Sequence, residues 1–158
     1  MVSNSGQWSV VSDQWSVVSD SLQKRIKQIK ILIMYFRDLI AYKKAFELAL
    51  EIFILSKGFP KEERYSLTDQ IRRSSKSTCS NIAEAYRKRI YPKHFRSKLT
   101  DSDGENSETL VWLDFAIACK YIDEQSYKKL SSENVEIGKL LNYMMLNPEK
   151  FGSKKDTE

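Results

Sequence analysis

The sequence contains few of the residues on which most metal centres and hydrolytic active sites depend. Its only histidine is His94, and its two cysteines, Cys79 and Cys119, form no Cys-x-x-Cys pair. A zinc site usually needs three or four histidine and cysteine ligands, and any nucleophile–histidine pair would have to use His94. The five glycines include no phosphate-binding loop, and the acidic segment at 101–108 lacks the ligand spacing of an EF-hand. We therefore expect a protein that is not an enzyme and that uses neither a metal nor a cofactor.

Long apolar runs are missing as well. The longest, ILIMYF at residues 31–36, is far shorter than the roughly 20 residues that a transmembrane helix needs, and no secretory signal is visible. The two cysteines allow one disulfide, but two reduced buried thiols are the commoner arrangement inside the cell. These features predict a soluble, cytoplasmic protein with no membrane partner.

Prolines are scarce and fall where helices would start or stop. Pro60, Pro92 and Pro148 all lie outside the periodic apolar segments, and neither hairpin turns nor sustained alternation indicates strands. Ser66 is the expected N-cap of the second helix, with Asp69 as its reciprocal capping partner. Short connections between amphipathic segments predict an all-α fold, an antiparallel up-down-up-down four-helix bundle. The expected helices lie at about 36–57, 66–89, 92–121 and 124–146.

Residues 7–13 and 14–20 are two identical copies of QWSVVSD. Two copies are too few for a coiled coil, and the paired valines have poor helix propensity. Perfect identity also exceeds what packing demands. We interpret the repeat as a translated tandem duplication of DNA upstream of the bundle, with Met34 as an alternative start. The expected parts of the chain are a poorly structured extension at 1–33, the bundle at 34–151 and a frayed tail at 152–158. Within the extension, the helical spacing of Leu22, Ile26, Ile29 and Ile33 leaves open a backward continuation of the first helix.

The first expected helix is apolar over more than half of its circumference. One stripe consists of Leu39, Tyr42, Phe46, Ala49, Leu50 and Phe53. Other apolar residues fall on a different side, and Trp112 and Phe115 likewise point away from the main stripe of the third helix. Either one subunit covers all these faces, or the second faces pack against another subunit, which we favour. The predicted oligomer interface comprises Leu48, Ile52, Leu55, Trp112 and Phe115.

The second and third helices are small and polar where they should meet. Ser74, Ser75 and Thr78 interrupt the apolar face of the second helix, and Gly104 lies near the middle of the third. Small residues let helix backbones approach closely, but their hydroxyl groups then need hydrogen-bond partners. We expect these helices to pack closely here, with Gly104 at the contact.

Positive charge is concentrated in one block of the sequence. Residues 64–99 carry ten basic groups and two acidic groups, whereas residues 100–158 carry seven basic and twelve acidic groups. The net charge of +5 therefore combines a local excess of +8 at 64–99 with +2 at 1–33, 0 at 34–63 and −5 at 100–158. Such a block attracts polyanions, or else it lies beside the acidic half and is largely neutralised. The sequence leaves both readings open.

The basic block is the best candidate for a binding surface. Tyr86, Tyr91 and Phe95 are interleaved with it and could stack on bases. The competing explanation is that these rings belong to the core and that the cations complement a helix dipole. The candidate nucleic-acid-binding residues are Arg72, Arg73, Lys76, Arg87, Lys88, Arg89, Lys93, Arg96 and Lys98.

Three segments resemble a known bacterial family of four-helix-bundle proteins. They are FRDLIAYKKAFELALEIF at 36–53, SLTDQIRRSSKSTCSNIAEAYRK at 66–88 and ENSETLVWLDFA at 105–116. The family includes proteins encoded by intervening sequences in 23S ribosomal RNA genes and the accessory variability protein of diversity-generating retroelements. The resemblance covers about residues 35–151. Arg72 and Arg73 stand at the family's QIRR positions, whereas Cys79 and Ala85 replace a proline and a glycine of many members.

This resemblance implies a compact bundle that assembles as a homo-oligomer, a ring-like pentamer in known members. The retroelement member binds a reverse transcriptase and is thought to contact nucleic acid through a basic surface. We therefore expect a non-enzymatic oligomer that binds nucleic acid, RNA before DNA, or a nucleic-acid enzyme such as a reverse transcriptase. The alternative is a structural or protein-interaction oligomer that binds no nucleic acid.

Overall fold

The computed structural model describes residues 19–27, 29 and 34–155. The chain divides into two units, Met1–Met34 and Tyr35–Glu158. In the first unit, residues 19–27 and 29 are helical, where we expected either poor structure or a helix. The helix follows from residues with good helix propensity after Asp20 and from the helical spacing of Leu22, Ile26 and Ile29. The QWSVVSD copies lie outside the described residues, apart from Ser19 and Asp20.

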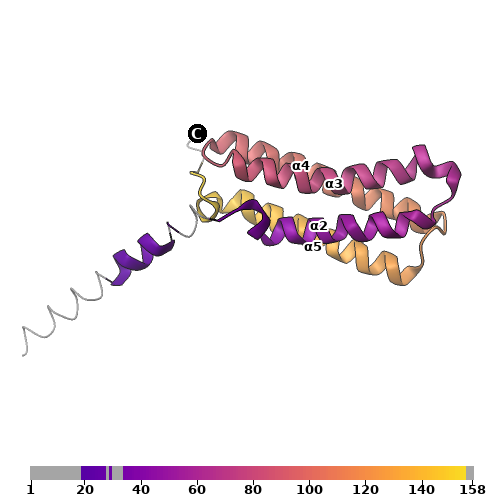
Figure 1. Cartoon of the computed structure of the whole chain (residues 1–158), viewed down its shortest axis with the longest axis horizontal. Helices are drawn as coiled ribbons and strands as arrows, with labels where there is room; N and C mark the ends of the chain where they lie inside the picture. Colours follow the sequence, from indigo (N-terminus) through magenta and orange to yellow (C-terminus); the bar gives the residue numbers. More distant parts are fainter. Residues whose placement is uncertain (1–18, 28, 30–33, 156–158) are drawn as a thin grey trace, which may run out of the picture. The chain divides into compact units, whose positions relative to one another are not determined.

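The second unit contains four long helices packed antiparallel (Figure 1), which confirms the all-α expectation. The pair α3–α4 and the pair α2–α5 lie side by side, and α3 also packs on α2 as α5 does on α4. Consequently α2 and α4 lie on one diagonal of the bundle. The four helices are α2 (Ile40–Leu55), α3 (Leu67–Arg87), α4 (Pro92–Ala118) and α5 (Glu124–Leu146).

Short 3-10 turns replace two of the predicted helix ends. The first expected helix is interrupted at Leu39, which has an extended backbone and separates η1 (Phe36–Asp38) from α2. The carboxylate of Asp38 accepts a hydrogen bond of 2.8 Å from the Tyr35 amide and closes the η1 turn. Further 3-10 turns are η2 (Ser56–Gly58), η3 (Lys61–Tyr65) and η4 (Pro148–Phe151).

The predicted capping of α3 by Ser66 is wrong. The Ser66 side chain accepts no amide hydrogen bond at this helix start. Glu63 does this instead: its carboxylate accepts hydrogen bonds from the Leu67 amide at 3.2 Å and from the Ser66 hydroxyl. These bonds, with a third from Tyr121, hold the pKa of Glu63 below its usual value. A glutamate in the preceding turn can reach the free amides because η3 folds it back over the helix end.

The α2 helix does have two apolar faces, but the inward face is not the expected one. Leu48 and Ile52 are only 2% and 1% exposed within the single subunit, so their assignment to an oligomer interface is wrong. Of the stripe expected to face inward, Leu39 and Ala49 are buried, whereas Phe46 and Leu50 face outward at 53% and 49% exposure. Ala41 and Ala45 share the buried face, and their small side chains let α2 approach its neighbours more closely than the aromatic face would.

A seam of buried polar side chains runs between the helices. Between α3 and α4, the Thr109 hydroxyl donates to Ser74 Oγ at 2.9 Å and the Ser102 hydroxyl donates to the Thr78 carbonyl at 2.9 Å. The close approach predicted for the small polar residues of these helices is thus confirmed. All three hydroxyls are fully enclosed; Ser74 and Thr109 also bond to carbonyls of their own helices, whereas Ser102 bonds to a carbonyl of α3.

Two asparagines continue this seam between α4 and α5. Asn106 Nδ2 donates to the Asn134 carbonyl at 3.0 Å, and Asn134 Nδ2 donates to the Asn106 carbonyl at 2.8 Å. The glycine that faces this pair is Gly138, where a Cβ would lie 3.4 Å from Asn106 Nδ2. The predicted role of Gly104 is wrong, because a Cβ there would meet nothing within 4 Å.

Among the described residues, no helix has the length and apolarity that crossing a bilayer requires.

The asparagine pair generates a stability prediction. Replacing Asn106 by alanine removes three of the four hydrogen bonds between the two residues and leaves only the bond from Asn134 Nδ2 to the Asn106 carbonyl, so the free energy of unfolding should fall by about 2–4 kcal/mol. Asn134→Ala should cost a similar amount. Because both single changes remove the two bonds between the side-chain amides, the double variant should lose at least about 1 kcal/mol less than the sum. Urea unfolding measures this cycle, with exposed Ser107→Ala as the control; additive losses would contradict the reciprocal pairing.

Candidate nucleic-acid interface

The basic block of the sequence is divided in space. Arg72 and Arg87 are fifteen positions apart on α3, which corresponds to about 22 Å along the helix axis. Arg72 lies near the α2–α3 connection, whereas Arg87 lies at the opposite end of the bundle with the start of α4. We call the first group the Phe53 cluster and the second the basic end.

The Phe53 cluster consists of Lys57, Arg72 and Lys76 around one aromatic ring. Lys57 Nζ, Arg72 Cζ and Lys76 Nζ lie 5.0, 4.9 and 5.5 Å from the Phe53 ring centroid. Arg72 Nε also donates a hydrogen bond of 2.7 Å to Ser56 Oγ, which fixes the guanidinium. None of the three cations has an ion-pair partner among the described residues. The π face attracts each cation, but the cluster retains its positive charge.

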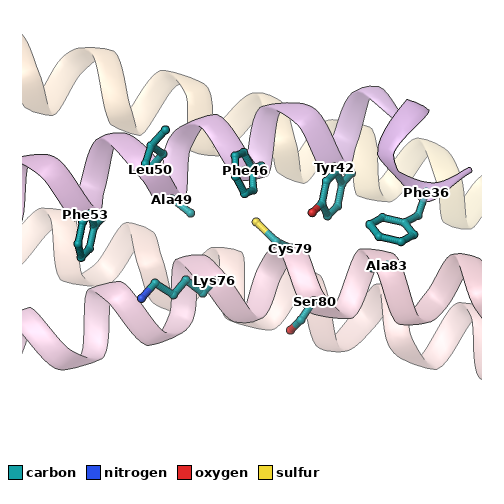
Figure 2. Close-up of a pocket in the computed structure, with 10 residues that line it drawn as sticks. All are labelled: Phe36, Tyr42, Phe46, Ala49, Leu50, Phe53, Lys76, Cys79, Ser80 and Ala83. Atoms are coloured by element: carbon teal, nitrogen blue, oxygen red, sulfur yellow. The ribbon is translucent and has the colours of Figure 1, made fainter.

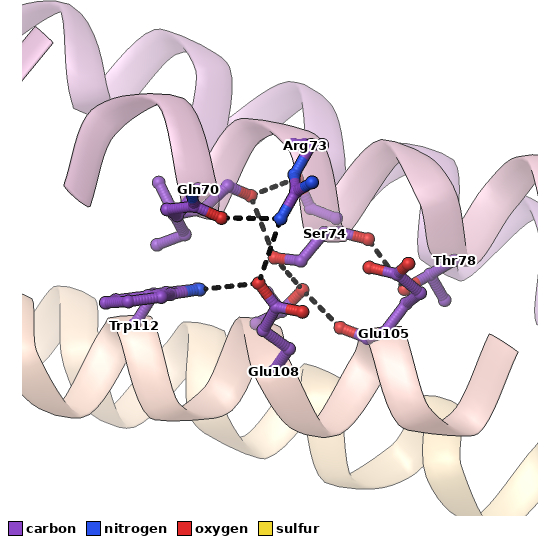
Figure 3. A network of polar contacts seen from close by, with 10 residues as sticks. Gln70, Arg73, Ser74, Thr78, Glu105, Glu108 and Trp112 are labelled. Carbon is purple, nitrogen blue, oxygen red and sulfur yellow. Dashed lines mark hydrogen bonds and ion pairs between the residues drawn. The ribbon is translucent and has the colours of Figure 1, made fainter. Parts of the chain in front are cut away.

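Arg73, next in sequence, is neutralised in part. Its guanidinium donates to Gln70 Oε1 at 2.7 Å and lies 3.7 Å from Glu108 Oε1 (Figure 3). The same carboxylate accepts a hydrogen bond of 3.1 Å from the Trp112 indole. Burial, followed by the charge of Glu108, raises the pKa of nearby Glu105. Arg73 therefore serves the α3–α4 contact more than an external ligand.

An apolar groove between α2 and α3 opens beside the Phe53 cluster (Figure 2). It has a volume of about 480 Å³ and lies on the outer, aromatic side of α2. Cys79 is at its floor, and burial raises the pKa of this thiol to about 11. Its lining residues are Phe36, Tyr42, Phe46, Ala49, Leu50, Phe53, Lys76, Cys79, Ser80 and Ala83.

Three cations of the basic end are held by the fold. Lys88 lies 2.6 Å from Glu84, and Lys98 lies 3.2 Å from both Glu84 and Asp101. Hydrogen bonds from Lys88 and then Lys98 lower the pKa of Glu84. Arg89 stacks on the Tyr86 ring, 4.2 Å from Cζ to the centroid, and donates to the Tyr86 carbonyl at 2.8 Å. The Lys98–Glu84 pair ties the end of α3 to α4, and the Lys88 and Arg89 contacts hold the end of α3 itself.

The other cations of the basic end are exposed. Arg87, Lys93 and Arg96 face solvent and have no ion-pair partner among the residues that the structure describes. Of the aromatic residues predicted to stack on bases, Tyr86 and Phe95 are each 1% exposed and belong to the core. Only Tyr91, at 59% exposure, is accessible to a base.

Sequence reasoning missed Lys57, Lys154 and Lys155. The last two belong to the expected frayed tail, yet Ser153 is buried and its amide donates to the Pro148 carbonyl at 3.0 Å. The left-handed backbone of Gly152, with φ of 81°, turns this segment back. Residues 156–158 of the tail lie outside the described part. Gly152, which follows η4, could have predicted a turn in the chain. No sequence pattern places Lys154 and Lys155 beside α4.

The remaining predicted interface residues lie on two separate helices. Leu55 and Trp112 are half-buried, and Phe115 is exposed on α4. The rings of Trp112 and Phe115 are 5.8 Å apart, and exposed Val111 lies next to them in sequence. Elsewhere, no group of three or more histidine, cysteine, aspartate or glutamate side chains in the described residues could hold a metal ion.

Comparisons with known proteins locate the bundle within one family. Residues 37–143 match the family model described as 23S rRNA-intervening sequence protein. A crystal structure of a protein of unknown function from the S23 ribosomal protein family of Bacteroides thetaiotaomicron VPI-5482 has a similar fold, with a TM-score of 0.62 and 30% identity. That similarity covers 68% of this chain and 96% of the other. No curated protein matches the chain.

The two thiols should differ in reactivity. At about pH 8 Cys79 stays protonated because burial raises its pKa to about 11, and the thiolate is the reactive form. Cys119 is exposed, so an alkylating reagent should modify Cys119 in the folded protein and both cysteines in urea. Mass spectrometry of the Cys119→Ser variant provides the control. Rapid alkylation of this variant in its folded state would contradict the burial of Cys79 at the floor of the groove.

Proposed function

This chain belongs to the 23S rRNA-intervening sequence protein family, and we propose that it is a non-enzymatic homo-oligomer that binds nucleic acid, RNA before DNA, through the basic end. The proposal assigns the Phe53 cluster to the contact between subunits rather than to the nucleic acid. A reverse transcriptase as partner is what the family resemblance implies, and it stays a prediction.

The observation that carries the nucleic-acid proposal is the concentration of unpaired cations at the basic end. Arg87, Lys93, Arg96, Lys154 and Lys155 are all exposed and have no ion pairs among the described residues. Unpaired surface cations bind phosphates with a gain from released counterions. Exposed Tyr91 supplies an aromatic face beside these cations, and stacking on such a face tolerates any base.

Two unpartnered apolar surfaces support the assembly proposal. One comprises Phe46, Leu50 and Ile54 on α2, which follow each other at four-residue steps and are each about half exposed. The other is the α4 patch formed by Val111, Trp112 and Phe115. Because α2 and α4 lie on a diagonal of the bundle, these surfaces face in opposite directions. A contact between the α2 surface of one subunit and the α4 patch of the next is therefore heterologous, which is the geometry that closes rings.

The charges around the α2 surface and the α4 patch are opposite in sign, which suits this head-to-tail arrangement. The α2 surface adjoins the Phe53 cluster with its three unpaired cations. The α4 patch lies among acidic residues of the same helix, including Glu108 and Asp114. Opposite charges around matching apolar centres favour the unlike pairing over α2 with α2 or α4 with α4.

The nucleic-acid proposal is tested by fluorescence anisotropy with a labelled single-stranded RNA over a salt series. Affinity should fall steeply between about 50 and 200 mM salt. Arg87→Gln/Lys93→Gln should reduce the magnitude of the log–log salt slope by about 1.4 if each cation contacts one phosphate. The charge-matched control is Lys128→Gln/Lys139→Gln, two exposed α5 lysines. Equal slopes for both variants, or no binding by the wild type at any salt, would rule out the proposed surface.

The assembly proposal is tested by mixing two defective chains in light-scattering experiments. Phe46→Glu and Phe115→Glu should each give a smaller species than the wild type, because each introduces a charge into one apolar surface. A heterologous contact leaves one intact surface on each variant, so their mixture should form a one-to-one dimer and no larger ring. Val135→Glu, a change at similar exposure on α5, should leave the wild-type assembly intact. A monomeric wild type would refute the proposal.

A further inference from the structure

A pocket at the basic end combines three cations with an apolar wall. It has a volume of about 260 Å³ and brings residues from the start of α4, the end of α5 and the C-terminal segment together. Arg96, Lys154 and Lys155 supply the charge. The complete lining is Pro92, Phe95, Arg96, Met145, Leu146, Pro148, Lys154 and Lys155.

The fold holds this pocket together across a large separation in sequence. Gly152 reverses the chain after η4, and the hydrogen bond from the Ser153 amide to the Pro148 carbonyl, 3.0 Å long, holds the reversed segment. Lys150 is engaged with the Tyr143 hydroxyl, 2.5 Å from Nζ. The two lysines that follow the turn therefore reach Arg96, which projects from the second turn of α4.

The charges in the pocket have no counter-charge within the described part of the chain. Arg96, Lys154 and Lys155 form no ion pair there. Glu84 on α3 and Asp101 on α4 are both engaged by Lys98. Three uncompensated cations at one small pocket repel each other, and a multiply charged oxyanion removes that repulsion.

The wall of the pocket is apolar and unusually exposed. Leu146 is 65% exposed, although it ends an otherwise amphipathic helix, and Met145 and Pro92 are half-buried beside it. Tyr91 directly precedes Pro92 and presents its ring to solvent. A flat apolar surface beside a phosphate site is what an unstacked base requires. The volume of about 260 Å³ is enough for one base and lies just below the range typical of small-molecule pockets.

We infer that this pocket binds one nucleotide unit of a single strand, with the phosphate against Arg96, Lys154 and Lys155 and the base on Leu146. The inference rests on the proposed function and adds its selectivity: the basic end prefers an unpaired strand to a duplex. The lysines of the C-terminal segment then act with α4 as one binding site.

The charge part is tested with Lys154→Gln/Lys155→Gln against the control Lys128→Gln/Lys139→Gln, which removes the same net charge from α5. Anisotropy with a labelled single-stranded RNA at fixed salt should show at least about fivefold weaker binding for the pocket variant than for the control. All four lysines are exposed, so thermal unfolding should be unchanged. Equal affinities of the two variants would overturn the inference while leaving the proposed function intact; no binding by the wild type would remove the proposed function itself.

The base part is tested with Leu146→Ser and with strands that differ only in their bases. The variant should bind the single-stranded RNA about fivefold or more weakly and bind an abasic strand of the same length as the wild type does. The wild type should also bind the single strand more tightly than a duplex of equal length. An equal loss on both strands, or a preference for the duplex, would overturn the assignment of a base to this pocket.

Discussion

The buried polar seam is the constraint on which the rest of the bundle depends. Ser74 with Thr109, Thr78 with Ser102 and Asn106 with Asn134 connect α3, α4 and α5 through side-chain hydrogen bonds. An apolar interface would tolerate sliding of one helix along another, whereas these groups are satisfied in only one register because each unmet bond is costly in the core. The seam therefore fixes α3 against α4, and this in turn sets where the basic end and the Phe53 cluster lie.

The sequence predicts the helices better than it predicts their neighbours. Four helices and the bounds of α5 follow from apolar spacing and from Pro148, and the close approach of α3 to α4 follows from Ser74 and Thr78. The orientation of α2 does not follow, because periodicity identifies apolar faces without saying which one is inside. The small alanines at 41 and 45 mark the face that packs inside. The larger rings of Phe46 and Phe53 favoured the opposite prediction. Gly104 and Gly138 show the same limit: a helical glycine is recognisable, but what faces it is a property of the fold.

Most of the basic residues of the candidate site could be predicted from the sequence, but their arrangement in space could not. Ten basic groups at 64–99 form one block in the sequence. In the structure, Arg72 and Arg87 of this block are about 22 Å apart along the axis of α3. Ion pairs within the described ranges then divide the block again, since Arg73, Lys88 and Lys98 are paired there while Arg87, Lys93 and Arg96 are not. Lys154 and Lys155 join the exposed set only through the turn at Gly152. The binding surface is thus assembled from chain segments that no local pattern connects.

The central claim is that nucleic acid binds at the basic end and not at the Phe53 cluster. The most direct measurement compares Arg87→Gln/Lys93→Gln with Arg72→Gln/Lys76→Gln, two variants of equal net charge, in single-stranded RNA binding over a salt series. Both belong in the Phe115→Glu background, where subunit assembly cannot contribute to affinity. The account predicts weaker binding and a shallower salt slope for the Arg87 and Lys93 variant alone. An equal or larger loss on changing Arg72 and Lys76 would contradict it.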